Sequence, residues 1–214
     1  MEAVAKRYWA PIFSFVRAAG TPPDKAADLT QGFIADVLLG RALLASADAS
    51  RGRFRSFLRR AVINYVRDRH RSDHTKRRSP SQGEVRSGPA AEAAARLEGA
   101  DATRVFDAHW AAQTVRIAAE RAARKLRGEG RELVWTVFER RTLRPQLFGE
   151  PPFPYDRLVR ELGLSSLGQA AHMAIAGRQA FLEALIEEIR STLGPGESLD
   201  DELRALLAAV EVNR

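Results

Sequence analysis

The sequence predicts an all-α protein made of two small helical domains that a flexible linker joins. Three observations lead to this prediction. Ala, Leu, Arg and Glu dominate the chain, and most of these residues favour helices. Apolar residues recur at helical spacing, and the alternation typical of half-buried strands is absent. Residues 79–103 are rich in Ser, Gly, Pro and Ala, a linker composition that separates the two helical halves.

The composition limits the class of protein. With 214 residues, 45% of them apolar, the chain can form one ordinary domain or two small ones with real cores. It has no cysteine, which excludes disulfides and thiolate metal sites and fits a reducing cytoplasm. No apolar run approaches the roughly 20 residues of a membrane span, and the N-terminus leads into no signal-peptide core. We therefore expect a cytoplasmic protein that is not bound to a membrane.

Three helices are expected in the first half. The first, ending near Gly20, has an apolar face formed by Tyr8, Trp9, Ile12, Phe13 and Val16. Thr21-Pro22-Pro23-Asp24 is typical of a helix start in which Thr21 caps. The second helix then places four apolar residues on one face, Leu29, Phe33, Val37 and Leu38. The third runs from about Phe54 towards Arg71, and its apolar face consists of Phe54, Phe57, Leu58, Ala61, Val62, Tyr65 and Val66.

The second half is expected to hold helices near Val105–Leu126 and Glu129–Arg141, then a turn from Pro145 to Pro154. Tyr155–Leu162, a short turn containing Gly163, and a helix from Ser166 have the pattern of a helix-turn-helix. The apolar face of the following helix is Phe181, Leu182, Leu185, Ile186 and Ile189. After a break at Gly194-Pro195-Gly196, an acidic amphipathic helix carries Leu199, Leu203, Leu206, Leu207 and Val210, and we expect it to pack on the helix-turn-helix.

Positive charge is concentrated in one segment. Arg51 to Arg78 holds eleven Lys or Arg and two Asp, a net charge of +9, whereas the whole chain has +7. Such clustering is typical of a polyanion partner, and nucleic acid is the favoured one. A membrane surface or simple solubility remains the alternative.

The helix in this segment has two chemically different sides. Opposite its apolar face lie Arg59, Arg60, Asn64, Arg67 and Asp68. Arg neutralises phosphates, and Asn with Arg can read base edges. For the aromatic residues Phe57 and Tyr65 core packing is the favoured interpretation, and stacking on an unpaired base is the alternative.

No catalytic or cofactor site is predicted. The four histidines are scattered, and His70 with His74 lacks a third metal ligand. Gly128 and Gly130 lack the strand before them and the Lys-Ser/Thr after them that a phosphate loop needs. We expect no enzymatic activity, metal or cofactor.

Three motifs together resemble the extracytoplasmic-function (ECF) sigma factors of the sigma-70 family. They are Tyr8-Trp9-x-Pro11-Ile12-Phe13, then Asp28-Leu29-Thr30-Gln31-x-Phe33, and Gly52-Arg53-Phe54-Arg55-Ser56-Phe57-Leu58. They occur in the order and spacing of the family's region 2. Residues 155–165 are similar to the start of the region 4 helix-turn-helix. The residue sequence of the second motif and the closing acidic segment resemble those of ECF sigma-factor subgroups that are abundant in planctomycetes and myxobacteria.

The resemblance implies a sigma factor that binds core RNA polymerase, helps to melt promoter DNA and starts transcription. Residues 1–78 would be region 2, residues 79–103 the linker, residues 104–193 region 4, and residues 194–214 a C-terminal helix. The clamp helices of the largest polymerase subunit would be bound by Asp28, Leu29, Gln31, Gly32 and Phe33. The flap of the second-largest subunit is a further implied partner. An anti-sigma or other regulatory protein is left open.

The resemblance also implies two DNA contacts. The −10 element would be bound by Arg53, Phe54, Arg55, Arg59, Arg60, Asn64, Arg67, Asp68 and Arg71. The −35 element would be bound by Ser165, Ser166, Gln169, His172, Met173 and Arg178. This second set departs from the family, whose recognition helix is usually rich in Arg, because only His172 and Arg178 can be basic here.

Two other functions stay open at this point. One is a DNA-binding regulator or adaptor that has the sigma-like fold without polymerase activity. The other is an RNA- or membrane-surface-binding protein that uses the basic helix alone.

Overall fold

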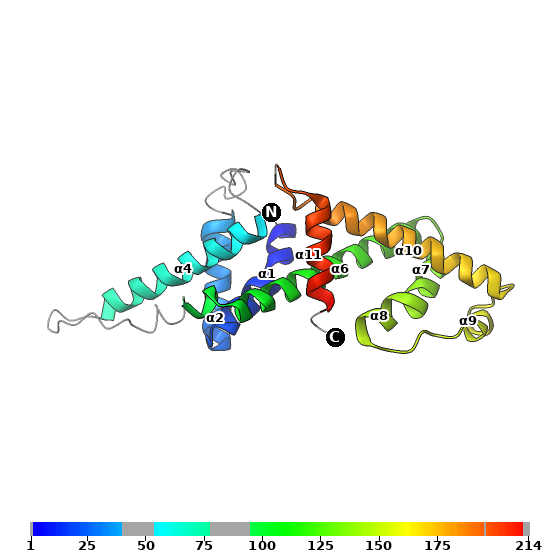
Figure 1. Cartoon of the computed structure of the whole chain (residues 1–214), viewed down its shortest axis with the longest axis horizontal. Coiled ribbons are helices and arrows are strands. Elements are labelled where there is room, and N and C mark those ends of the chain that lie inside the picture. Colours follow the sequence, from blue (N-terminus) through cyan, green and yellow to red (C-terminus); the bar gives the residue numbers. More distant parts are fainter. Residues whose placement is uncertain (1, 40–53, 78–94, 195, 212–214) are drawn as a thin grey trace. The chain divides into compact units, whose positions relative to one another are not determined.

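The structure, a computed structural model, describes residues 2–39, 54–77, 95–194 and 196–211. These residues form helices and no strand, which confirms the predicted all-α class (Figure 1). None of the described helices is long and apolar enough to cross a membrane. The chain divides into unit 1, Met1–Gln113 with Thr192–Asn213, and unit 2, Thr114–Ser191. The division falls inside helix α6 (Ala100–Gly128), and the domain boundaries predicted above stay predictions.

Unit 1 begins with two helices, α1 (Glu2–Ala18) and α2 (Pro23–Phe33), on either side of a turn in which Gly20 has a φ of 82°. The buried face of α1 is Tyr8, Ile12, Phe15 and Val16. The expected face was partly wrong, because Trp9 is 39% exposed and Phe15 takes its place in the core. The expected cap at Thr21 was also wrong. Pro22 precedes the helix, and no side chain caps it, since α2 begins one residue later than a Thr21 cap requires.

The basic helix is α4 (Phe54–Arg77), which extends further than predicted. It follows α2 and a π-helical continuation, η1 (Ile34–Leu39), in the described chain. Leu58, Val62 and Val66 recur every four residues and are at most 1% exposed, so one side of α4 lies in the core. An edge-to-face aromatic contact links α2 to α4, with the ring centroids of Phe33 and Tyr65 5.6 Å apart. The predicted apolar face of α4 is therefore confirmed at its centre.

The chain just before α6 also packs in unit 1. Residues 95–98 are helical, and Leu97 is 1% exposed. The Arg96 guanidinium donates to the carbonyl of Ala19 at 3.4 Å. Phe106 of α6 meets Phe15 edge to face at 5.5 Å between ring centroids. These contacts attach the start of α6 to the α1–α2 pair.

The acidic helix α11 (Leu199–Glu211) belongs to unit 1. The expectation that it packs on the helix-turn-helix was therefore wrong. Its position follows from a buried charge, because Glu202 is 5% exposed and forms an ion pair with Arg55 of α4. Leu206 is buried beside it, whereas Leu207, which was placed on the same apolar side, is 59% exposed.

Unit 2 holds the second half of α6 and five further helical segments. These are α7 (Glu132–Phe138), the π-helical η3 (Glu139–Leu143), α8 (Arg144–Phe148), α9 (Tyr155–Leu162) and α10 (Leu167–Arg190). The expected turn from Pro145 was wrong at its start. Pro145 lies in the first turn of α8, where a missing N–H is tolerated, and the helix ends at Gly149 with a φ of 66°.

The two helices expected around a short glycine-containing turn are present as α9 and α10. Gly163 ends α9 with a φ of 63°, a conformation that glycine adopts without strain. Ser166 caps α10 by accepting a hydrogen bond from the Gln169 N–H. A shared core holds the two helices on α7, and its buried members are Val137, Leu158, Leu164, Ala170 and Ala174.

Gly177 generates a stability prediction, because it lets α10 approach α7 closely. A Cβ at this position would lie 2.3 Å from the Phe138 Cβ and 2.9 Å from the Val134 carbonyl oxygen. We expect Gly177→Ala to destabilise unit 2 by about 1–3 kcal/mol, since backbone on both sides must move. Urea unfolding followed by circular dichroism measures the loss.

Gly168→Ala is the matched control, because the nearest atom to its added Cβ, the Ser166 Oγ, is 3.8 Å away. This variant should leave stability unchanged or raise it by up to about 1 kcal/mol. Equal effects of the two substitutions would contradict the close approach at Gly177.

Candidate nucleic-acid interface

The exposed side of α4 carries a row of polar groups. Arg60, Asn64 and Asp68 are spaced four residues apart and are all exposed. They lie opposite Leu58, Val62 and Val66, which fix that helix against the core. One cation, one amide and one carboxylate are thus presented together on a helix that cannot rotate without exposing its apolar side. We call these three residues the reading row.

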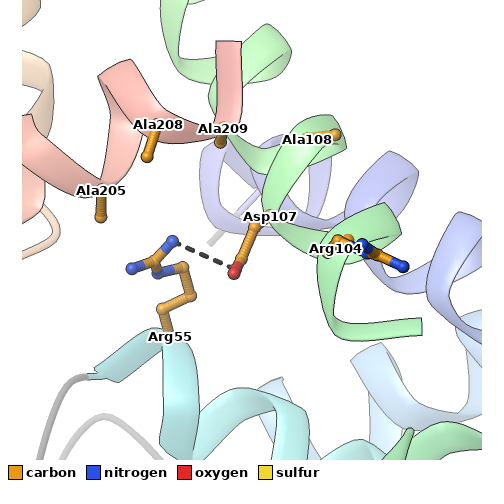
Figure 2. Close-up of a pocket in the computed structure, with 7 residues that line it drawn as sticks. All are labelled: Arg55, Arg104, Asp107, Ala108, Ala205, Ala208 and Ala209. Carbon is orange, nitrogen blue, oxygen red and sulfur yellow. Dashed lines mark hydrogen bonds and ion pairs between the residues drawn. The ribbon is translucent and has the colours of Figure 1, made fainter. Parts of the chain in front are cut away.

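Arg55 has a different place from the reading row. It is 9% exposed, and its Nη1 lies 3.1 Å from the Asp107 Oδ1 of α6. Its Nη2 lies 3.6 Å from the Glu202 Oε1 of α11, and its guanidinium carbon is 4.3 Å from the centroid of the Trp110 ring. Figure 2 shows Arg55 and Asp107 pointing toward one another beneath α11. Arg55 therefore joins three helices of unit 1.

The partners of Arg55, which are Asp107, Trp110 and Glu202, were not predicted from the sequence. One signal was available. At 100° per residue Arg55 follows Phe54 into the apolar sector of the helix, so its side chain points into the domain. A cation in that sector requires a buried carboxylate, yet nothing in the sequence indicates which one.

Two further predicted DNA-binding cations contact carboxylates of the same chain. The Arg59 Nη1 is 3.7 Å from the Asp107 Oδ2, and the Arg67 Nη2 is 2.8 Å from the Glu98 Oε1. Burial lowers the pKa of the Arg59 guanidinium, and Asp107 opposes that shift. Arg59 nevertheless stays protonated at neutral pH, because its ordinary pKa is so high. Arg60 therefore differs from Arg55, Arg59 and Arg67, because no carboxylate among the described residues forms an ion pair with it.

Three members of the predicted −10 set remain, and only Phe54 has a described side chain. Phe54 is half-buried, and its ring meets the Tyr8 ring with centroids 5.7 Å apart. Its backbone N–H donates to the Glu197 carboxylate. Arg53 lies outside the described residues, and the side chain of Arg71 is likewise outside the described part of α4.

The predicted polymerase-binding residues divide into a buried and an exposed group. Leu29 is 8% exposed and Phe33 is fully buried, so both belong to the core of unit 1. Asp28 and Gln31 are exposed on α2. Gly32 has an intradomain role, because a Cβ there would lie 2.3 Å from the Tyr65 hydroxyl oxygen.

Tyr65 connects α4 to the π-helical segment η1. Its hydroxyl donates to the Asp36 Oδ2 at 3.1 Å and accepts from the Arg69 Nε at 3.0 Å. Arg69 also donates to Asp36, at 2.5 Å. Burial raises the pKa of the Tyr65 hydroxyl, so it stays protonated at neutral pH. The favoured prediction of core packing for this ring fits its edge contact with Phe33.

The predicted −35 set on α10 splits in the same way. Ser166 caps the helix, and the Gln169 Oε1 accepts from the Ser165 N–H at 2.6 Å and from its hydroxyl at 3.0 Å. Met173 is half-buried and packs against the unit 2 core. His172 and Arg178 are exposed. The serines and the glutamine thus already serve the geometry of the turn.

The exposed face of α10 is more apolar than basic. Leu167 is 56% exposed, Ile175 58% and Leu182 41%. With 3.6 residues per turn they share a face with His172 and Arg178. A surface of this composition offers phosphates little electrostatic attraction.

A cavity of about 300 Å³ adjoins the Arg55 cluster. Its lining consists of Arg55, Arg104, Asp107 and Ala108 with three alanines of α11, Ala205, Ala208 and Ala209 (Figure 2). Both cations in the lining form ion pairs with carboxylates, Arg55 with Asp107 and Arg104 with Asp101. Among the residues that the structure describes, no group of three His, Asp or Glu side chains could hold a metal ion.

Comparisons with protein-family models, with curated proteins and with solved structures found no match to this chain. The resemblance to sigma factors therefore rests on the motifs quoted above. No related protein contributes to the description of α4 and α10.

Arg55→Met generates a stability prediction. The substitution keeps much of the side-chain volume but removes the ion pair with Glu202 and leaves Asp107 paired with Arg59 alone. We expect unit 1 to lose about 3 kcal/mol of stability, because one partner of a buried ion pair is removed. Thermal and urea unfolding measure this loss.

Arg60→Met is the control for that variant, since Arg60 is exposed on the same helix. It should change stability by no more than about 0.5 kcal/mol. A small effect of Arg55→Met would show that the buried cluster contributes little to the fold.

Proposed function

We propose that this protein is a sigma factor of the extracytoplasmic-function type, a subunit that directs RNA polymerase to promoters and opens the −10 element. The single observation that carries the proposal is the reading row. Arg60, Asn64 and Asp68 are exposed in line on a helix whose opposite face is buried. The three region 2 motifs in family order support the same function.

Promoter opening requires capture of separated bases and requires no catalytic group. Arg60 has the charge for a phosphate, and the Asn64 amide can both donate to and accept from a base edge. The Asp68 carboxylate can accept from a base amino group. A protein of this kind lowers the cost of strand separation by holding the unstacked bases, so neither metal nor cofactor takes part in the proposal.

Polymerase would be bound through the exposed side of α2. Asp28 and Gln31 are available there, and Leu29 and Phe33 keep the helix on its core. The flap of the second-largest subunit and the −35 element would be met by region 4. Two weak DNA contacts gain strength from effective concentration once polymerase fixes their spacing.

A second candidate has one observation in its favour, the apolar exposed face of α10. A regulator or adaptor with this fold would use that face without starting transcription. It would bind duplex DNA or a protein without polymerase, whereas a sigma factor binds free duplex poorly. Gel-shift assays with and without core polymerase separate the two candidates.

The reading row generates a functional prediction. Asn64→Ala and Asp68→Ala should each reduce promoter opening by a factor corresponding to about 1–3 kcal/mol, because each removes a base contact. Fluorescence of 2-aminopurine placed in the −10 element, with core polymerase from the same organism, measures opening. Stability should stay unchanged, since both side chains are exposed.

Arg69→Gln is the control, because Arg69 is an exposed cation of α4 on the side of Tyr65. It should open promoters like the unmodified protein. Absence of core binding and of transcription from a genomic promoter library would refute the sigma-factor proposal.

A further inference from the structure

The start of α4 is held by carboxylates from a distant part of the chain. The Phe54 N–H belongs to the first turn of α4, where backbone donors have no acceptor within the helix. It donates to the carboxylate of Glu197, which also accepts from the Gly194 N–H at 2.6 Å. One residue later Arg55 forms its ion pair with Glu202, at 3.6 Å. Two adjacent residues of α4 thus contact two carboxylates of the segment formed by residues 196–211.

These contacts have the chemistry of a helix anchor. A carboxylate at a helix N-terminus satisfies an orphan donor and interacts favourably with the helix dipole. Glu202 is 5% exposed and Asp107 is half-buried, so their charges require the guanidiniums of Arg55 and Arg59. Loss of either Glu197 or Glu202 would remove part of the anchor without touching the reading row.

We infer that Glu197 and Glu202 are positioning residues for α4, so that the segment formed by residues 196–211 sets the geometry of the reading row. The part of this inference that concerns nucleic acid rests on the function proposed above. Neither carboxylate would contact nucleic acid, since Glu197 binds the Phe54 N–H and Glu202 pairs with the buried Arg55. Their effect reaches Arg60, Asn64 and Asp68 through the rigid helix that begins at Phe54.

Hydrogen exchange on the full chain tests the anchor without any nucleic acid. We expect Glu197→Gln and Glu202→Gln to speed amide exchange in residues 54–60 at least threefold, with exchange in α10 unchanged. Asp200→Asn is the matched control, because Asp200 lies in the first turn of α11, is exposed and carries the same charge. Unchanged exchange at the start of α4 in both glutamine variants would overturn the inference.

A second measurement tests whether Glu197 and Glu202 position α4, only stabilise the protein, or mask the positive charge of α4. Each glutamine variant loses a negative charge beside a basic helix, so its affinity for duplex DNA should stay equal or rise. Promoter opening, read by 2-aminopurine, should nevertheless fall at least threefold, and Glu202→Asp should restore part of it. Opening that rises in Glu202→Gln would instead mean that the carboxylates mask α4, and it would overturn the inference.

The two experiments also separate this inference from the proposed function. If the unmodified protein opens no promoter, the proposed function fails. The exchange measurement then still decides whether Glu197 and Glu202 anchor α4.

Discussion

Unit 1 depends on one buried cation, the guanidinium of Arg55. A charge that is 9% exposed is costly unless its environment supplies counter-charges, and here α6 and α11 each provide one. The Trp110 ring covers the guanidinium at 4.3 Å and adds a cation–π contact. The same arrangement that neutralises Arg55 therefore decides which helices meet. The start of α4, the first half of α6 and the acidic α11 have to converge, because none of their buried charges is tolerated alone.

This constraint divides the cations of α4 between two tasks. Arg55 and Arg59 form ion pairs with Asp107 or Glu202 at the packed start of α4, and Arg67 forms a more exposed ion pair with Glu98. Arg60 projects away from them beside Asn64 and Asp68. Part of the positive charge of the segment is thus paired with carboxylates of the same chain. On the described side of α4 opposite its buried face, one cation, one amide and one carboxylate stay exposed in a row.

Much of the fold could be predicted from local pattern, and the site only in part. The buried Leu58, Val62 and Val66, the turn at Gly163 and the cap at Ser166 follow from spacing and residue type, which act within a few residues. The Arg55 partners could not be found this way, because Asp107 and Glu202 resemble any other surface carboxylates in the sequence. The helix that starts at Arg144 was not predicted, because proline usually breaks a helix. Pro145 is nevertheless tolerated here because it lies in the first turn. Local signals set the helices, whereas long-range charge pairing set their assembly.

The contact between Phe54 and Glu197 also has a consequence for biosynthesis. The two residues are separated by 143 positions. At a translation rate of about 5–20 residues per second, the basic helix leaves the ribosome several seconds before its carboxylate exists. During that interval the start of α4 lacks the carboxylates of Glu197 and Glu202 that contact it in the folded chain. Closing so long a loop also slows the final folding step relative to local helix formation. The nascent chain therefore passes through a state whose positive charge is greater than that of the finished protein.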